Sequence, residues 1–557
     1  AKIDENGVLD IGFLTPGVGF DNSVLKILSL ENNASIVVGS FLKFNGNIAS
    51  RIVRLLEDGS SDINFNAVEK GANNTIRAAI RQNDSKIIIA GNFTTYNNNL
   101  INRICRILPN GGFDATFNIG TAANNIIYAV AIQSDQKIIV AGNFTKFNGE
   151  TVGRIIRLNS DGSIDGGFNA GLGAEASIEA LEIQPDGKIL IGGRFVMFNG
   201  TSSPHIIRLN PDGSIDTNFI IDNGFDKNVY NIALQSDNKI VVGGSFLTYK
   251  GISQKRIARL LPNGTLDLSF VSGTGFSKGD VRTILIQPND KILIGGTFSG
   301  TFNGYPSLRI IRLLPEGNRD TTFEAYLNNT LFSMALTTNH KLLIGGNFNS
   351  VSGIARHRIA RLFLCTDSSV WNGVSWSRGY PSGGKELLFQ ADYPSLSTTN
   401  ACNCSIDSGK TVTLNENNSL SLTYNYTGLG TLILENGASL YQSDEKSLNT
   451  GIAKIKRNTI PVRRYDFTYW SSPVFEPTLE SVSPETLSDK YHSYSGTGWV
   501  YENKTNKMKI GKGYAIRAPQ SYSITDPEVY TAIFSGIPNN GTVEGETVVA
   551  GNYYLAG

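Results

Sequence analysis

The stretch Lys137-Ile-Ile-Val-Ala-Gly-Asn-Phe144 is followed by Arg154-Ile-Ile-Arg-Leu158, the pair Asp161-Gly162 and the motif Asp165-Gly-Gly-Phe168. Short β-branched runs separated by Asn-Gly or Asp-Gly pairs are typical of antiparallel strands joined by tight turns. The series recurs every 50–52 residues, with Gly-x-Phe beginning at Gly39, Gly91, Gly142, Gly193, Gly244, Gly296 and Gly346. About four short strands in such a period predict one blade of a β-propeller per repeat.

The position of Asp-x-x-Phe indicates how the ring closes. Each of the first six Gly-x-Phe units ends on this motif, but the seventh runs from Arg361 into Leu364-Cys365 without it. A further copy precedes the first unit, at Asp10–Phe13. We therefore expect a seven-bladed propeller over residues 1–363 in which the N-terminal strand completes the last blade and removes two exposed sheet edges.

Composition supports an all-β chain and argues against several classes of protein. The 557 residues carry 49 Lys and Arg against 48 Asp and Glu, a formal charge of +1, whereas a nucleic-acid binder normally has a basic excess. Hydrophobic residues make up 40%, enough to build a core, and no apolar run approaches the roughly 20 residues that span a bilayer. Ala1 is not an initiator Met, so we expect a processed chain.

The repeats resemble the delta-60 repeat, a bacterial family found mostly in long extracellular proteins. The resemblance covers residues 1–363 and rests on the Gly-Asn-Phe and Arg-Leu…Asp-Gly-x-x-Asp-x-x-Phe signature. It implies a β-propeller used for display or binding at a surface, without an assigned chemistry.

The last third has a different pattern. Residues 364–445 are rich in Ser, Thr, Asn and Tyr and predict a small β-sandwich or a short stack of β-coils. Residues 446–557 form a third β-rich region. The series Trp371-Asn-Gly-x-x-Trp376, Tyr465-Asp-Phe-Thr-Tyr-Trp470 and Gly511-Lys-Gly-Tyr514 resembles the C-terminal region of flavobacterial type IX secretion substrates with a type C sorting signal. The sorting domain that follows in those proteins is absent from this chain.

Cysteine use fits export. Cys402 and Cys404 are one residue apart, which disfavours a bond between them, so Cys365 is the expected partner of one of the two. Cys105 replaces an apolar residue of a strand and predicts a buried free thiol.

One Arg and one Asp recur in each blade. A ring of arginines could bind a polyanion, but their equal numbers favour a structural Arg–Asp pair that is bidentate and pins one strand to its neighbour. The arginines are Arg54, Arg106, Arg157, Arg208, Arg259, Arg312 and Arg361, and the aspartates are Asp10, Asp62, Asp114, Asp165, Asp216, Asp267 and Asp320.

No motif nominates a catalytic, cofactor-binding or metal-binding residue. The Asp-Gly pairs lack the spaced carboxylates of a calcium loop. Ser408-Gly409-Lys410-Thr411 resembles the end of a phosphate loop, but Cys404 stands where its first glycine belongs. The histidines are His205, His340, His357 and His492, and they form no metal or catalytic motif.

The expected function is therefore that of an exported, non-enzymatic surface protein. The resemblance implies passage through the type IX translocon with its outer-membrane shuttle β-barrel as partners, and a role in adhesion linked to gliding motility. The expected ligand is a glycan or surface protein, and the loops 171–176, 222–227 and 272–279 vary most between repeats. The alternatives are a secreted propeller enzyme acting on polysaccharide and a structural spacer in a surface layer.

Overall fold

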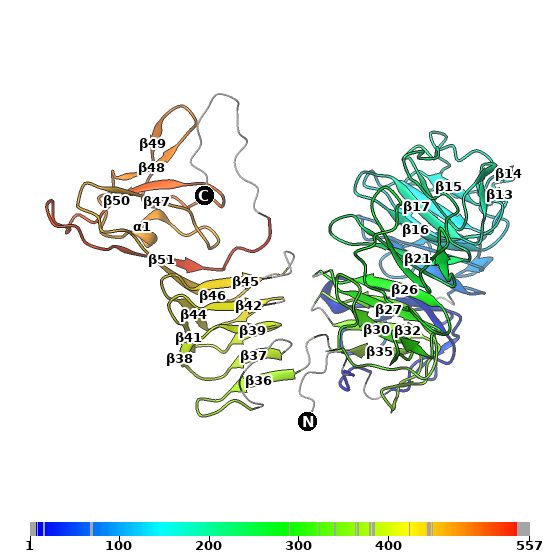
Figure 1. Cartoon of the computed structure of the whole chain (residues 1–557), viewed down its shortest axis with the longest axis horizontal. Coiled ribbons are helices and arrows are strands. Elements are labelled where there is room, and N and C mark those ends of the chain that lie inside the picture. The colour runs from blue at the N-terminus through cyan, green and yellow to red at the C-terminus, as the bar shows by residue number, and fades with distance from the viewer. Residues whose placement is uncertain are drawn as a thin grey trace. The chain divides into compact units, whose positions relative to one another are not determined.

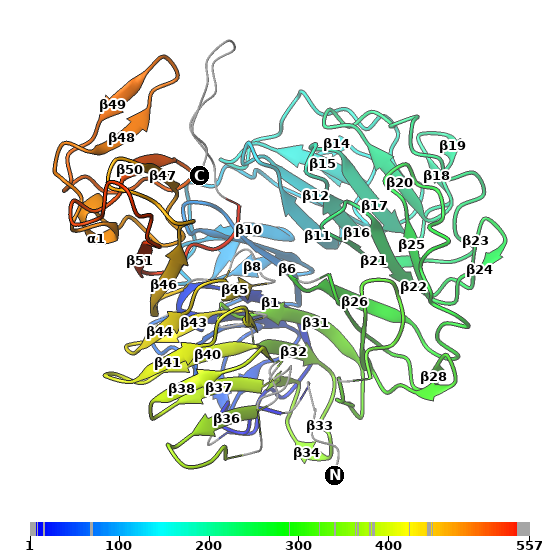
Figure 2. The same cartoon turned by 60° about the vertical axis from the view of Figure 1, so that its left-hand side comes forward.

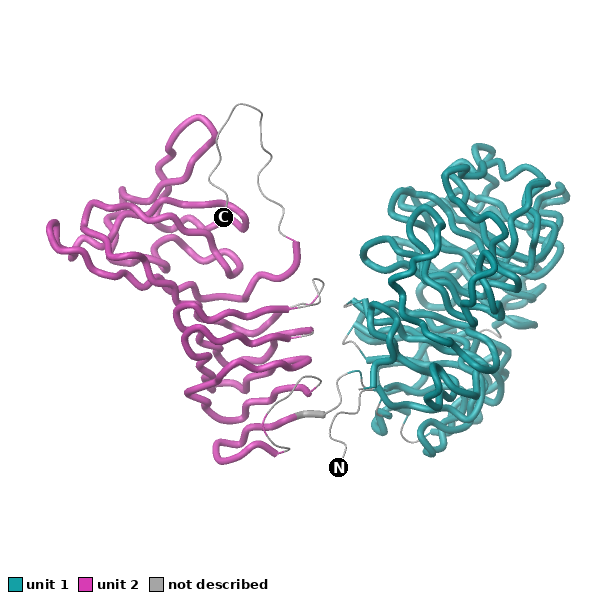
Figure 3. Tube along the Cα trace, in the orientation of Figure 1, with its two compact units in different colours: residues 1–364 teal, residues 365–557 magenta. Residues whose placement is uncertain are grey.

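The computed structural model divides the chain into two units, Ala1–Leu364 and Cys365–Gly557 (Figure 3). It describes residues 7, 9–14, 17–66, 71–288, 290–321, 323–338, 341–362, 364, 367–377, 380, 385–422, 424–442, 447 and 449–542. Within these residues the fold is all-β, as predicted, apart from a 3₁₀ turn (Glu31–Asn33) and helix α1 (Leu479–Val482). None of the described helices is long and apolar enough to cross a membrane.

The first unit is a propeller of seven three-stranded antiparallel sheets (Figure 1). In the first blade β1 (Val24–Ser29) pairs with β2 (Ser35–Gly39), which pairs with β5 (Ile52–Leu55). A short hairpin, β3 (Lys43–Phe44) and β4 (Asn47–Ile48), connects β2 to β5. The fourth strand that we expected is reduced to a single bridge, Leu55 to Ser61.

The other six blades repeat this plan. Their inner strands are β6 (Ile76–Arg81), β11 (Ile127–Ile132), β16 (Ile178–Ile183), β21 (Val229–Leu234), β26 (Val281–Ile286) and β31 (Leu331–Leu336). Their middle strands are β7 (Ile87–Gly91), β12 (Ile138–Gly142), β17 (Ile189–Gly193), β22 (Ile240–Gly244), β27 (Ile292–Gly296) and β32 (Leu342–Gly346). Their third strands are β10 (Ile104–Ile107), β15 (Ile155–Leu158), β20 (Ile206–Leu209), β25 (Ile257–Leu260), β30 (Ile310–Leu313) and β35 (Ile359–Leu362).

The connecting hairpins of these six blades are also regular. They are β8 (Thr95–Tyr96) with β9 (Asn99–Leu100), β13 (Lys146–Phe147) with β14 (Glu150–Thr151), β18 (Met197–Phe198) with β19 (Thr201–Ser202), β23 (Thr248–Tyr249) with β24 (Ile252–Ser253), β28 (Thr301–Phe302) with β29 (Tyr305–Pro306), and β33 (Ser350–Val351) with β34 (Ile354–Ala355).

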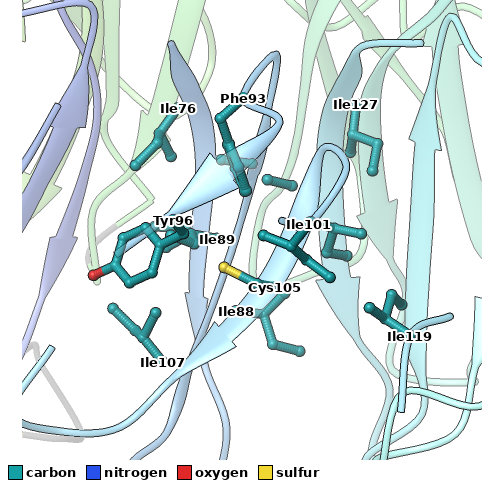
Figure 4. Packing of buried hydrophobic residues seen from close by; sticks show 14 of the residues in the cluster. Ile76, Ile88, Ile89, Phe93, Tyr96, Ile101, Cys105, Ile107, Ile119 and Ile127 are labelled. Atoms are coloured by element: carbon teal, nitrogen blue, oxygen red, sulfur yellow. The ribbon is translucent and has the colours of Figure 1, made fainter. Parts of the chain in front are cut away.

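The core lies between the blades. All residues of the middle strands are buried, which explains their continuous apolar sequence. Figure 4 shows this packing around Phe93 and Ile127, with the thiol of Cys105 among the isoleucines. The glycine of Gly-x-Phe is needed because a Cβ on Gly39 would lie 2.1 Å from the carbonyl oxygen of Ser23.

The inner strands surround the propeller axis, and β1 packs against both β6 and β31 (Figure 2). Blade seven is completed from the N-terminus: Leu9 bridges to Leu362, and the Asp10 amide donates to the Arg361 carbonyl at 2.8 Å. Of the segment 1–13, residues 1–6 and 8 lie outside the described residues. The strand pairing at Leu9 and Asp10 joins the two ends of the repeat array.

The second unit begins as a β-solenoid of parallel strands, which is the stack of β-coils and not the β-sandwich. One face contains β36 (Asp367–Trp371), β37 (Lys385–Phe389), β40 (Asn403–Ile406) and β43 (Tyr426–Gly428). A second contains β38 (Tyr393–Leu396), β41 (Thr411–Leu414), β44 (Thr431–Leu434) and β46 (Ile452–Asn458), and a third contains β39 (Thr399–Ala401), β42 (Ser419–Leu422) and β45 (Ser439–Gln442). Val412 aligns with Leu432 and Leu420 with Leu440, so aliphatic side chains of successive coils stack on one another.

The boundary that we expected at residues 445–446 lies outside the described residues, and residues 365–557 belong to one compact unit. Strand β46 continues the solenoid sheet and pairs antiparallel with β51 (Thr531–Gly536) near the end of the described chain. Between them lies a four-stranded antiparallel sheet in the order β47 (Phe467–Trp470), β50 (Tyr514–Arg517), β48 (Tyr491–Tyr494) and β49 (Trp499–Tyr501). Because β46 and β51 belong to one sheet, residues 365–557 form one unit.

Because Asp10 completes the last blade, we expect it to contribute as much to the stability of the propeller as the equivalent aspartates of the other blades. Asp10→Ala should lower the free energy of unfolding of the propeller by about 3–5 kcal/mol, the cost of leaving a buried charge without its partner. Asp216→Ala should have a similar effect, and Asp84→Ala, at an exposed turn, should have little. Urea unfolding followed by far-UV circular dichroism measures this. Closure by the N-terminal strand would be contradicted if Asp10→Ala behaved like Asp84→Ala.

Candidate binding surface at the propeller mouth

The recurring Arg and Asp meet within each blade. The Arg208 Nε donates to Asp216 Oδ2 at 2.8 Å, and both side chains are buried. The equivalent ion pairs are Arg54–Asp62, Arg106–Asp114, Arg157–Asp165, Arg259–Asp267, Arg312–Asp320 and Arg361–Asp10. In each blade the arginine also lies over the ring of the Asp-x-x-Phe phenylalanine, as Arg208 does over Phe219 at 4.7 Å.

The pairing differs from the two-oxygen fork that we expected. Arg54 reaches only Oδ2 of Asp62, with Nε at 2.8 Å and Nη2 at 2.6 Å. The other oxygen, Oδ1, accepts the amide of Asn64 at 2.9 Å and closes a turn. In six blades a lysine also approaches Oδ2, as Lys188 does for Asp216 at 3.1 Å, whereas Ala34 occupies its place in the first blade.

The arginine also connects neighbouring blades. Nη1 of Arg106 donates to the Ser160 carbonyl at 2.7 Å, and Arg54 donates to the Pro109 carbonyl at 2.7 Å. Arg361 donates to the Glu57 carbonyl, which links blade seven to blade one. Burial alone would raise the pKa of Asp165, but hydrogen bonds from the Gly167 amide, Lys137 and Arg157 lower it to about 2. These contacts use the arginines and aspartates to hold the ring together, so they are not free to bind a polyanion.

The cysteines divide into one bonded and two free residues. Cys402 forms a disulfide, whereas Cys105 and Cys404 are buried free thiols whose pKa values are raised by burial. The remaining cysteine, Cys365, lies outside the described residues.

The loops that vary between repeats lie on the face where the inner strands begin. Part of each loop has a structural role, because its polar side chain accepts backbone amides of a hairpin. The Asp226 carboxylate accepts the amides of Leu247 and Thr248, and the Glu175 carboxylate accepts those of Val196 and Met197. These bonds fix the loops 171–176 and 222–227 to the next hairpin. The loop 272–279 is fixed in the same way, by Ser277 Oγ accepting the Thr301 amide.

At the same face, seven side chains of different chemistry surround the axis. They are the second residues of the inner strands, and we call them the mouth ring: Leu25, Arg77, Tyr128, Glu179, Tyr230, Arg282 and Phe332. In every blade the strand register shifts across this residue, as between Val24 and Lys26. A β-bulge re-aims a side chain, and such bulges are frequent beside functional sites.

Five of these residues form an arc of rings and charges. Arg77 lies over Tyr128 at 5.3 Å, and Arg282 lies over Tyr230 at 3.9 Å. Between them, Glu179 accepts a hydrogen bond from Nε of Arg194 at 2.5 Å. This hydrogen bond and the charge of Glu179 raise the pKa of Arg194, although burial works in the other direction. Arg194 is the middle residue of the fourth Gly-x-Phe, so two repeat positions contribute to one surface.

Arg77 differs from Arg194 and Arg282 because its charge is not neutralised by a carboxylate among the described residues. Arg282 donates to Asp280 at 2.8 Å and Arg194 to Glu179, so each has a carboxylate partner. Among the described residues no carboxylate pairs with Arg77. The arc thus offers two tyrosines and a net positive charge, a combination suited to an anionic ligand.

Deeper along the axis, two opposite charges face each other from opposite sides of the ring. Lys26 lies on blade one and Glu182 on blade four. Burial raises the pKa of Glu182 to about 7, although the charge of Lys26 works in the other direction. Lys26 is exposed to solvent, but the surrounding protein desolvates its amine and lowers its pKa, against the charge of Glu182.

Sequence reasoning missed the mouth ring, although one signal was present. Next to the aliphatic residue that begins each inner strand, this position changes from Leu to Arg, Tyr, Glu and Phe. The bulge that turns these residues toward the axis cannot be read from the sequence.

His205, which replaces a repeated Arg, is buried with Nδ1 3.1 Å from the Gly193 carbonyl oxygen, and burial lowers its pKa. No group of three or more His, Cys, Asp or Glu in the described part of the chain could hold a metal ion.

Comparison with known families agrees with the two units. Residues 36–65, 82–117, 133–168, 184–219, 235–270 and 287–323 match a family described as a domain of unknown function (DUF5122) beta-propeller. Residues 366–554 match another domain of unknown function, DUF8693. No curated protein matches the sequence.

Solved propellers are similar at low sequence identity. The WD40 propeller domain of Doa1 is 12% identical, with 62% of this chain and 94% of that chain covered and a TM-score of 0.40. The extracellular domain of a putative hybrid two-component system from B. thetaiotaomicron is 13% identical, with coverages of 61% and 40% and a TM-score of 0.38. Virginiamycin B lyase from Staphylococcus aureus is 12% identical, with coverages of 62% and 96% and a TM-score of 0.37. Residues 36–323 thus contain six matches to the DUF5122 beta-propeller family, in agreement with the propeller fold of the first unit.

The raised pKa of Glu182 predicts a pH-dependent stability. The unfolded chain has a glutamate pKa of about 4.3, so the folded state holds this proton more tightly. The free energy of unfolding should therefore fall as the pH rises from about 4.3 through 7, and Glu182→Gln should remove this part of the fall. Urea unfolding at pH 4.5 to 8 tests it, with Glu150→Gln on an exposed hairpin as control. Parallel profiles for the wild type and Glu182→Gln would contradict the assignment.

Proposed function

We propose that this chain is an exported, non-enzymatic surface protein whose propeller recognises an acidic glycan or protein at the mouth ring. The observation that carries this proposal is the arc from Arg77 to Arg282. There, the residue at the bulge differs in chemistry from blade to blade and includes two arginines, two tyrosines and a glutamate. Tyr and Arg are the side chains most enriched at recognition surfaces, and they combine ring faces with hydrogen-bond donors.

The charge of the arc defines the ligand class. Arg194 and Arg282 are held by Glu179 and Asp280, so these arginines present oriented donors that are already fixed. Arg77 supplies a guanidinium that a ligand carboxylate or sulfate would neutralise. The proposed ligand is therefore an acidic polysaccharide or an acidic protein surface.

The same contacts support the proposal that the protein is not an enzyme. A propeller enzyme acting on polysaccharide, the alternative function, would use carboxylates at the mouth as acid, base or nucleophile. Glu179 of the arc and Asp280 beside Arg282 each accept a hydrogen bond from an arginine. This pairing supports a role in orienting the arginines.

The export route is proposed from the C-terminal sequence. The series from Trp371 to Tyr514 resembles type IX secretion substrates, so the translocon and its shuttle β-barrel are the proposed partners during export. Adhesion linked to gliding motility is the proposed cellular role.

Arg77 provides a direct test of the ligand site. We expect Arg77→Ala to weaken binding to an acidic polysaccharide by about tenfold or more, because a charge-assisted hydrogen bond contributes about 1.5–3 kcal/mol. Alginate, polygalacturonate and chondroitin sulfate are suitable probes in surface plasmon resonance. The matched control is Arg81→Ala at the opposite end of the same strand, where Arg81 pairs with Glu31. Equal losses in the two variants, or no binding of any probe by the wild type, would contradict the proposed site.

Deletion of the gene tests the cellular role. We expect reduced attachment to polysaccharide-coated glass and reduced colony spreading, both restored by the wild-type gene but not by the Arg77→Ala allele. Export is followed separately, by fractionation of cells that lack the translocon, where the protein should accumulate inside. Normal attachment and spreading of the deletion strain would remove the adhesin role. Normal surface exposure without the translocon would remove the type IX route.

A further inference from the structure

The four-stranded sheet of the second unit has one face covered with aromatic side chains. Strand alternation places Phe467 and Tyr469 of β47, His492 and Tyr494 of β48, and Trp499 and Tyr501 of β49 on the same face, together with Ala515 of β50. We call this set the aromatic face. Arg517 of β50 lies on this face too, beside Phe467, but it is buried and donates to Gln520 at 2.7 Å. The opposite face carries Tyr491, Tyr514 and Ile516, which are buried in the core. The core is thus built by the residues of the opposite face, and the residues of the aromatic face are not part of it.

The aromatic face is open to solvent. Tyr469 is 62% exposed, Trp499 53% and Tyr501 53%. Contiguous exposed aromatic patches on soluble domains usually mark binding sites, whereas single exposed apolar residues do not. The face contains a hollow of about 380 Å³, which is lined by Phe467, Tyr469, His492, Trp499 and Ala515. This volume lies within the range of roughly 300–1,000 Å³ that holds small ligands.

The rings hold one another in place. Tyr469 and Trp499 come from the two edge strands, yet their ring centroids are 6.3 Å apart and their planes differ by only 24°. They therefore lean toward each other over the small Ala515. Tyr494 packs edge-on against Trp499 at 5.3 Å, and His492 lies 5.8 Å from Phe467. A platform whose rings are fixed before binding loses little conformational entropy when a ligand arrives.

The chemistry of this platform defines its ligand. We propose that the aromatic face binds a neutral oligosaccharide, whose C–H faces stack on the rings while its hydroxyls reach the polar tips. The hollow is lined by no Asp, Glu, Lys or Arg side chain among the described residues, so its charge matches an uncharged ligand. A hydrocarbon ligand in the hollow would offer no partner to the Tyr469 hydroxyl, the Trp499 indole N–H or the His492 imidazole.

A peptide fits this surface less well. Peptides that add a strand to a sheet bind at an edge through main-chain hydrogen bonds, whereas the aromatic face offers side chains only. A proline-rich peptide in an aromatic groove is the competing occupant, and such a peptide therefore serves as a second probe. The site lies outside the propeller and requires neither the mouth ring nor Arg77.

Tryptophan fluorescence reports on the second unit without a contribution from the propeller. All four tryptophans, Trp371, Trp376, Trp470 and Trp499, lie in the second unit, so the propeller contributes no signal. The full-length chain is titrated with cellohexaose, laminarihexaose, chitohexaose and xylohexaose, and with a (Pro)₁₀ peptide. We expect at least one hexasaccharide to change the fluorescence saturably, and Tyr469→Ala and Trp499→Ala to weaken its binding at least tenfold by calorimetry.

Controls separate this site from a general effect and from the propeller. Tyr441→Ala removes an equally exposed tyrosine, at 62%, from the solenoid and should leave binding unchanged. Arg77→Ala should also leave it unchanged. The proposal is overturned if no hexasaccharide binds, if Tyr441→Ala weakens binding as much as Trp499→Ala, or if only the peptide binds. A fold defect is checked by circular dichroism, and the conservative Trp499→Phe should retain part of the affinity if the ring itself is the platform.

Discussion

The propeller depends on one charged side chain that must be satisfied in every blade. The arginine of the third strand is buried in six blades and half-buried at Arg54. Its guanidinium is neutralised by Oδ2 of the aspartate eight residues later, for example Arg259 by Asp267 at 2.8 Å, and in the last blade by Asp10. The same guanidinium reaches a turn carbonyl of the next blade and covers a phenylalanine ring. A buried charge without these partners would cost several kcal/mol, so the blades are constrained to meet at this point. The near-zero net charge of the chain reflects this repeated pairing.

This constraint separates the structural residues of the propeller from those available for function. Positions that repeat, such as the glycine at close approach and the Arg–Asp pair, are occupied by contacts within the ring. The mouth ring does not repeat, since it changes from Leu25 to Arg77, Tyr128 and Glu179 in successive blades. Recognition on a repeat protein is expected at such positions, because a ligand is asymmetric while the scaffold is not.

The second unit follows the same principle with a different geometry. The solenoid is stabilised by inward residues that stack coil upon coil, such as Leu414 on Leu434 and Ile455. Its antiparallel sheet then uses one face for the core and leaves the other covered with rings. Trp371 and Trp376, which carry the sequence resemblance, pack on the first coils with Phe389 and Tyr393 and are partly buried. Their role is structural, whereas Trp499 is free to contact a ligand.

The sequence by itself determined the number of blades and the use of Asp10 to complete the last one, because a 51-residue period and a displaced motif are properties of the chain order. It predicted about four strands in each blade, whereas the structure reduces the fourth to a single bridge. It also determined that Arg and Asp act together, since they recur in equal numbers. Only the tertiary structure decided that the pair shares one carboxylate oxygen, that a bulge turns Arg77 and Tyr128 toward the axis, and that β46 merges the last two regions into one unit. Sequence periodicity reports which side of a strand is buried, whereas these features depend on bulges and on contacts between residues far apart in the chain. Tyr469 and Trp499 are 30 residues apart in sequence and come from opposite edges of a sheet, so only the folded chain brings their rings together.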